Sequence, residues 1–118
     1  MTQTIQGKHL LLVEDDELVA LTVEDILLHV GAGSVTVAAS VPVALDALEQ
    51  RHFDVAIVDI NLNGHASWPV AARLQAAGIP YLSVTGYGDM VEHELIQTLL
   101  PKPYSMDQLL KAVSALLA

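Results

Sequence analysis

Two patterns of hydrophobic residues alternate along the chain. Short apolar runs rich in Val, Ile and Leu occupy residues 9–14, 34–38, 54–59, 79–84 and, less distinctly, 97–101. Strands that are apolar at every position are typical of a parallel sheet that is covered on both faces. The segments between these runs are longer and repeat their apolar residues with helical spacing. The alternation predicts an α/β fold, with a doubly wound five-stranded parallel sheet between two layers of helices.

Local signals mark the ends of the predicted helices. The expected helices cover 16–30, 41–51, 68–77 and a last segment that opens at Ser105. Gly31 follows the first segment as a stop signal, and Ser40 precedes the second as an N-cap. Ser67 precedes the third segment, and Gln108 completes a capping box with Ser105.

Composition narrows the class of protein. The 118 residues predict one domain, 1–118, without a linker or a repeat. No apolar run approaches the roughly 18 to 20 residues of a membrane span. The chain has no cysteine, which fits a cytoplasmic protein. Its formal charge of -9 opposes binding to nucleic acid, so we expect protein partners, cations or small ligands.

Polar residues follow four of the five predicted strands. They are Glu14, Asp15 and Asp16 after the first, Asp59 and Asn61 at the end of the third, Thr85 after the fourth and Lys102 after the fifth. In a doubly wound sheet the carboxyl ends of the strands form the ligand-binding edge. Two like charges about 4 Å apart repel by about 4 kcal/mol at an effective dielectric constant near 20. Because Lys102 brings one positive charge, this set predicts a divalent cation, with Mg²⁺ favoured by its oxygen ligands.

The same edge is suited to phosphoryl chemistry. A loose phosphoryl-transfer transition state needs charge neutralisation and positioning more than covalent help. Asp59 could act as the nucleophile, since aspartate forms covalent phosphoryl intermediates. Thr85 and Lys102 could each hold one phosphoryl oxygen.

Four motifs in order give the chain a family resemblance. LLVEDDE at 11–17, VDINLNG at 58–64, SVTGYG at 83–88 and PKPY at 101–104 make it resemble the receiver domain of a two-component response regulator. The resemblance implies the flavodoxin-like strand order 2-1-3-4-5. It also implies that Asp59 is the phosphoacceptor and that Thr85 and Lys102 hold the phosphoryl group.

Further roles follow from the same resemblance. Asp15 and Asp59 would ligate Mg²⁺ directly, Asn61 through its backbone carbonyl, and Glu14 through water or not at all. The peptide bond between Lys102 and Pro103 would be cis. The phosphoryl donor would be a phosphohistidine on a sensor histidine kinase, of the HWE type among others, or on a phosphotransfer protein.

The implied output is protein–protein contact by a stand-alone receiver. We expect no DNA-binding domain, and no enzymatic activity beyond the chain's own phosphorylation and dephosphorylation. Apolar residues on the last helix leave a homodimer open. The sequence does not distinguish three roles for such a receiver: a phosphate sink, a phosphate shuttle or a regulator of its kinase.

The chain departs from the common receiver pattern between the fourth and fifth strands. Sixteen residues separate Thr85 from Lys102, so 89–97 is expected to form a short helix or a mobile loop in place of a full fourth helix. Leu99 stands where an aromatic residue is usual, and Pro101 fits only an edge strand. The TGYG loop, the helix start at 67–71 and the shortened 89–97 segment together resemble the FATGUY group of single-domain regulators.

Other interpretations remain open. A phosphatase-type enzyme with an aspartyl-phosphate intermediate would usually carry a second acid where Asn61 stands. A phosphorylation-independent interaction module could retain the same polar edge. Asp16 and Glu17 are expected to cap the first helix rather than bind metal. The five histidines show no metal-ligand spacing.

Overall fold

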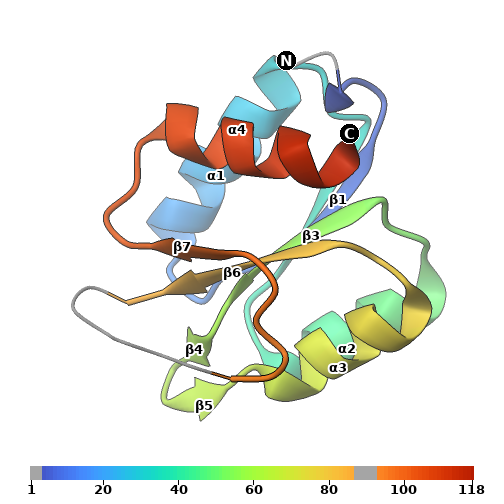
Figure 1. Ribbon diagram of the computed structural model, residues 1–118, viewed down its shortest axis with the longest axis vertical. Coiled ribbons are helices and arrows are strands. Elements are labelled where there is room, and N and C mark those ends of the chain that lie inside the picture. The colour runs from blue at the N-terminus through green and yellow to red at the C-terminus, as the bar shows by residue number, and fades with distance from the viewer. Residues whose placement is uncertain (1–3, 87–92) are drawn as a thin grey trace.

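A five-stranded parallel sheet forms the centre of the molecule (Figure 1). The structure is a computed structural model that describes residues 4–86 and 93–118. The strands of the sheet are β1 (His9–Val13), β2 (Ser34–Ala38), β3 (Val55–Asp59), β6 (Tyr81–Thr85) and β7 (Leu99–Pro101). Their order is β2-β1-β3-β6-β7, and all neighbours are parallel. This order confirms the predicted 2-1-3-4-5, because β6 and β7 are the fourth and fifth strands of the sheet.

A small antiparallel hairpin follows β3 and lies outside the main sheet. It consists of β4 (Asn61–Leu62) and β5 (His65–Ala66), joined through Asn63 and Gly64. Both turn residues have positive φ, 52° and 84°. Glycine and asparagine tolerate this left-handed conformation better than other residues do. The hairpin was not predicted.

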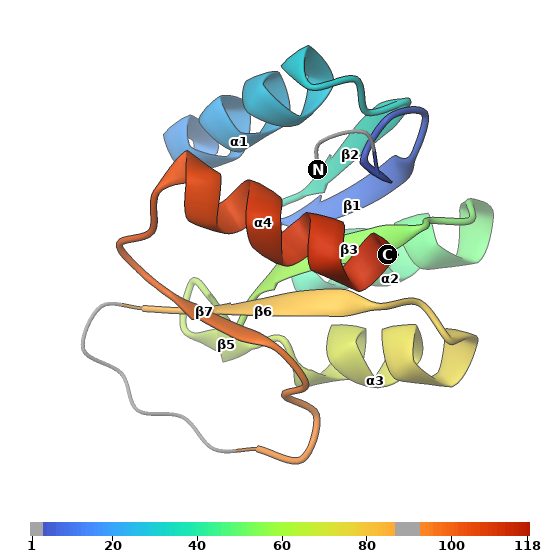
Figure 2. The same ribbon diagram turned by 45° about the horizontal axis from the view of Figure 1, so that its top comes forward.

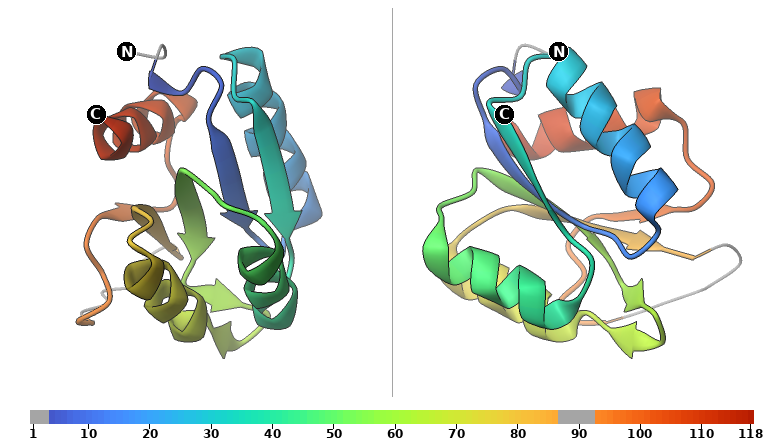
Figure 3. Two further views of the ribbon diagram at one scale, coloured as in Figure 1. Left: turned by 90° about the vertical axis from the view of Figure 1, so that its right-hand side faces the viewer. Right: turned by 180° about the vertical axis from the view of Figure 1, so that it is seen from behind.

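The described residues form four helices, two on each face of the sheet. They are α1 (Glu17–His29), α2 (Val41–Gln50), α3 (Trp68–Ala77) and α4 (Met106–Leu117). Figure 2 and Figure 3 show α1 and α4 on one face and α2 and α3 on the other. Alternate residues of β1 serve the two faces: Leu10 packs with the α1 and α4 side, Leu11 with the α2 and α3 side.

The side chains expected to cap α1, α2 and α4 do so, whereas Ser67 at the start of α3 makes no side-chain cap hydrogen bond. One carboxylate oxygen of Asp16 accepts hydrogen bonds from the backbone N–H groups of Leu18 and Val19, at 3.0 and 3.2 Å. Ser40 caps α2, and the capping box opens α4 at Ser105. The sequence therefore predicted the bounds of each helix to within one or two residues, because the residues that signal a helix start lie next to it in the chain.

The connection between β6 and β7 contains no helix in its described part, residues 93–98, which form turns and bends. Residues 89–92 of the predicted short helix or loop lie outside the described residues. Pro101 lies in β7, at the edge of the sheet, as predicted. The Lys102–Pro103 peptide bond is cis, as the resemblance implied.

Within residues 4–86 and 93–118, no helix combines the length and the hydropathy that crossing a bilayer requires.

Candidate functional site

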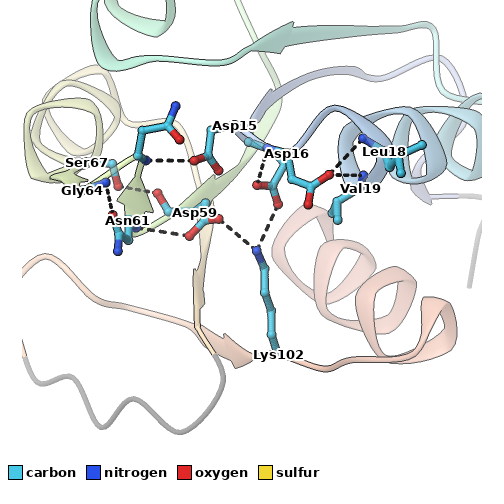
Figure 4. A network of polar contacts seen from close by, with 11 residues as sticks. Asp15, Asp16, Leu18, Val19, Asp59, Asn61, Gly64, Ser67 and Lys102 are labelled. Atoms are coloured by element: carbon cyan, nitrogen blue, oxygen red, sulfur yellow. Dashed lines mark hydrogen bonds and ion pairs between the residues drawn. The ribbon is translucent and has the colours of Figure 1, made fainter.

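A polar pocket of about 400 Å³ lies at the carboxyl edge of the sheet. Its lining residues are Glu14, Asp15, Asp16, Asp59, Asn61, Asn63, Gly86 and Lys102. The ends of β1, β3, β6 and β7 meet here, because parallel strands direct all their carboxyl ends to one edge. Figure 4 shows Lys102 reaching from the β7 side toward Asp59.

Three carboxylates converge in this pocket. Glu14, Asp15 and Asp59 each offer an oxygen atom, and these three atoms lie within 4.8 Å of one another. Glu14 is only 4% exposed and Asp59 only 6%. Burial strengthens their mutual repulsion because water no longer screens the charges. Clustered carboxylate oxygens are also the ligands that Mg²⁺ prefers, so the donor set fits a divalent cation.

Lys102 bridges two of the three carboxylates. Its Nζ donates a hydrogen bond to Oδ2 of Asp59 at 3.0 Å and to Oε1 of Glu14 at 3.2 Å. Burial lowers the pKa of Lys102, but the hydrogen bond to Asp59 and the two nearby negative charges more than offset this and raise the pKa above its ordinary value. The ammonium group therefore stays charged and balances part of the acidic cluster.

Burial and the nearby charge of Asp59 both favour the protonated form of Glu14. Burial is the main effect that raises its pKa, to about 7, and the charge of Asp59 adds to it. The N–H of Asp16, which donates to Oε2 of Glu14 at 3.2 Å, and the Lys102 ammonium oppose the rise. Near neutral pH both protonation states of Glu14 are therefore populated when no cation is bound.

Backbone and hydroxyl groups hold Asp59 in place. The N–H of Asn61 donates to its Oδ1 at 3.2 Å, while Lys102 occupies Oδ2. The hydroxyl of Ser67 donates to the backbone carbonyl of Asp59 at 2.6 Å. These contacts direct the carboxylate into the pocket and fix it at the end of β3 (Figure 4).

The β4–β5 hairpin completes the opposite wall of the site. The N–H of Asn63 donates to Oδ2 of Asp15 at 2.8 Å, and the N–H of Gly64 donates to Oδ1 of Asn61 at 2.8 Å. The hairpin therefore orients Asp15 through a backbone donor and holds Asn61 at the pocket.

The structure brings most of the predicted site residues together. Glu14, Asp15, Asp59, Asn61 and Lys102 all line the pocket. Thr85 lies at the end of β6, is 1% exposed and accepts a hydrogen bond from the N–H of Lys102 at 2.9 Å through its carbonyl. It is not among the lining residues, so its contact with a phosphoryl group remains a prediction.

Sequence reasoning did not assign Asn63, Ser67 and Gly86 to the site. Asn63 contributes a backbone N–H and Ser67 a hydroxyl directed at a backbone carbonyl. The Asn63–Gly64 pair is a turn signal and could have predicted the hairpin. Nothing in the residue types alone indicates which atoms these turns direct into the pocket.

The arrangement suits transient chemistry on a carboxylate. A buried aspartate lies beside a permanent ammonium group and two further carboxylates that can hold a cation. Positive charge on both sides of a bound phosphoryl group would offset the charge of its oxygens.

Comparisons with known proteins agree with the geometry. A family model described as response regulator receiver domain matches residues 10–114. The solution structure of SdrG from Sphingomonas melonis Fr1 is 37% identical, with a TM-score of 0.81 over 94% of this chain and 97% of that one.

Two further solved structures are similar over almost their whole length. SdrG from Pseudomonas melonis Fr1, in a BeF3-activated conformation, is 33% identical, with a TM-score of 0.73 over 96% of this chain and 98% of that one. A putative response regulator from Chloroflexus aurantiacus J-10-fl is 27% identical, with a TM-score of 0.83 over 95% and 98%. A search of curated proteins gave no match.

Proposed function

Because the chain belongs to the response regulator receiver domain family, we propose that it accepts a phosphoryl group on Asp59 in a Mg²⁺-dependent phosphorelay. The observation that carries the proposal is the position of Asp59. Its carboxylate is 7% exposed, contacts Lys102 at 3.0 Å and lies in a cluster of three acidic groups. The donor would be a phosphohistidine on a sensor histidine kinase or a phosphotransfer protein.

The proposed reaction is a displacement at phosphorus. A carboxylate oxygen of Asp59 forms a bond to the phosphorus atom while the bond from phosphorus to the histidine nitrogen breaks, and the freed imidazole takes up a proton. Lys102 is already 3.0 Å from Oδ2 and would move its ammonium group onto a phosphoryl oxygen. Thr85 would hold another of these oxygens.

The acidic cluster is the proposed metal site. Asp15, Asp59, the Asn61 carbonyl and Glu14 would hold Mg²⁺, which when bound neutralises charge on the phosphoryl oxygens. Asp15 is oriented for this by the N–H of Asn63. Water would later hydrolyse the acyl phosphate, and the phosphorylated state would signal by contact with another protein in the cytoplasm. A kinase of the HWE type is the narrower expectation for the donor.

Labelling of an Asp59→Asn variant tests the proposal. The amide is a poor nucleophile, so we expect labelling by acetyl phosphate in Mg²⁺ to fall to background, measured by intact mass or by phosphate-affinity gel electrophoresis. Asp25→Asn is the matched control. Asp25 is exposed on α1, so its substitution removes the same charge without changing the pocket. Persistent Mg²⁺-dependent labelling of Asp59→Asn, or steady turnover of a small phosphate ester by the unmodified chain, would contradict the proposal.

A further inference from the structure

The start of α3 is attached to the backbone of Asp59. Ser67, the N-cap residue of α3, is 1% exposed, and its hydroxyl is not used to cap the helix. It donates instead to the Asp59 carbonyl at 2.6 Å, while the N–H of Ser67 donates to the carbonyl of Ile60 at 2.8 Å. Two hydrogen bonds therefore join this helix start to the strand end that carries the proposed phosphoacceptor.

The next residue contacts the connection between β6 and β7. The ring of Trp68 stacks on the ring of His93, with centroids 3.8 Å apart and planes 8° from parallel. Stacked aromatic pairs contribute free energy beyond the area they bury. Trp68 therefore links the helix start that holds Asp59 to a segment that follows β6 by several residues.

Residues 93–96 form a small structured unit around His93. The N–H of Leu95 donates to Nδ1 of His93 at 3.1 Å, and the N–H of Ile96 donates to the His93 carbonyl at 3.0 Å. The hydroxyl of Tyr81, a buried residue of β6, donates to the carbonyl of Leu95. A displacement of the His93 ring consequently affects the backbone of the whole unit.

The path is short and continuous. It runs from Asp59 through Ser67 to Trp68, and from Trp68 across the ring contact to His93. A phosphoryl group on Asp59 displaces the present contacts of its carboxylate with Lys102 or Asn61. This change takes place at the end of β3, on the residue whose backbone carbonyl accepts the hydrogen bond from Ser67.

We infer that Ser67 and Trp68 form a positioning unit, in which Ser67 holds the backbone of Asp59 and the Trp68–His93 stack transmits the state of Asp59 to residues 93–96. This inference rests on the proposed function and adds the route by which phosphorylation is registered elsewhere on the surface. A ligand shifts a conformation only through contacts that differ between states, and here those contacts are the hydrogen bond to Asp59 and the ring stack.

The test uses ¹H–¹⁵N NMR spectra of the full chain with Mg²⁺ and BeF₃⁻, a phosphoryl analogue. In the unmodified chain we expect the signals of Asn61 and Gly64, beside Asp59, and of Leu95 and Ile96 to shift together. In His93→Ala, where the stack is lost at a half-buried position, Asn61 and Gly64 should still shift while Leu95 and Ile96 no longer respond. His29→Ala, which removes an exposed histidine of α1, should behave like the unmodified chain.

Ser67 is tested by the concentration of BeF₃⁻ that gives half saturation. Because the Ser67 hydrogen bond holds the backbone of Asp59 where binding needs it, its loss, at about 1 kcal/mol for one buried hydrogen bond, predicts a rise of up to roughly fivefold for Ser67→Ala. Ser67→Thr keeps the hydroxyl and should restore binding, whereas a merely structural defect would give similar binding in both variants.

The outcomes separate the two proposals. If Asn61 and Gly64 do not respond in the unmodified chain and Asp59 is not labelled, the proposed function fails. If they respond but Leu95 and Ile96 do not, or if Leu95 and Ile96 shift equally in His93→Ala, the positioning unit alone is overturned. Equal half-saturation for Ser67→Ala and the unmodified chain also overturns it.

Discussion

Glu14 is the residue at which protons and cations compete. Its carboxyl group is almost fully buried, and burial raises its pKa to about 7, with a further contribution from Asp59. A carboxyl group must lose its proton before it can ligate a cation well. The charge of Glu14 near neutral pH therefore depends on whether a proton or a cation occupies the site.

Mg²⁺ affinity should consequently rise with pH around neutrality. Below the pKa of Glu14, one proton must leave for each ion bound, so the apparent affinity is expected to fall about tenfold per pH unit. Isothermal titration calorimetry at pH 6, 7 and 8 measures this, and buffers of different ionisation enthalpy reveal the released proton. Glu14→Gln should bind more weakly but without this pH dependence. A flat profile in the unmodified chain would show that Glu14 does not take part.

The same pKa predicts how stability without metal depends on pH. The folded state holds a proton on Glu14 between its ordinary pKa of 4.5 and about 7, and the unfolded state releases it. Folding therefore binds a proton in this window, and the free energy of unfolding should fall as pH rises through it. Urea denaturation in EDTA at pH 5 and pH 7 tests the sign, with Glu14→Gln as the control that lacks this contribution. If the unfolding free energies of the unmodified chain and of Glu14→Gln rise by the same amount between pH 5 and pH 7, this assignment is refuted.

At this scale the sequence predicted side chains better than backbone groups. Glu14, Asp15, Asp59 and Lys102 could be chosen because the carboxyl ends of parallel strands meet at one edge of the sheet, where these charged residues come together. The contributions of Asn63 and Ser67 depend on a turn geometry that places one N–H and one hydroxyl within 2.8 Å of a partner. Residue type does not encode that geometry.

The helices show what local chemistry can determine. The start of α4 is fixed by two reciprocal hydrogen bonds: the N–H of Gln108 to Oγ of Ser105 at 3.0 Å, and the N–H of Ser105 to Oε1 of Gln108 at 2.8 Å. Such contacts join residues that are three positions apart in the chain, so they can be predicted from the sequence. The β4–β5 hairpin has only two residues per strand, too few for a hydrophobic period to be visible.

Ser105→Ala should destabilise the protein through the start of α4. Loss of the cap leaves the N–H of Gln108 without its side-chain acceptor, and the expected cost is about 1 kcal/mol of unfolding free energy. Chemical denaturation measures it. Ser105→Thr keeps an oxygen acceptor and should lose much less. If both variants lose the same amount, the cap is not the cause.

At the scale of the whole molecule, one sheet separates two hydrophobic cores. Leu74 of α3 is buried on one face and Leu109 of α4 on the other, both at 0% exposure. Strand β1 contributes alternate residues to both cores, so neither face can be lost while the other remains intact. The layering was predictable for this reason, since fully apolar strands permit few other arrangements, whereas the strand order was implied by the family resemblance.

Core truncation should therefore lower the stability of the entire domain. Leu109→Ala is expected to cost about 2–5 kcal/mol of unfolding free energy through lost burial and a cavity. Leu18→Ala is the matched control, because Leu18 is 77% exposed on α1, and exposed substitutions usually change stability by no more than about 0.5 kcal/mol. Fluorescence and circular dichroism should report the same single transition in both variants. Two separate transitions would show that the faces unfold independently.

The double contact of Lys102 has a consequence for reversibility. The Lys102 ammonium group already pairs with the carboxylates of Glu14 and Asp59. An arriving cation or phosphoryl group therefore has to displace this ammonium group and does not enter a site of uncompensated negative charge. Such an exchange gives up part of the attraction that three uncompensated acids would offer. Under the proposed function, the site would therefore release its cation and its phosphoryl group more readily than three uncompensated acids would.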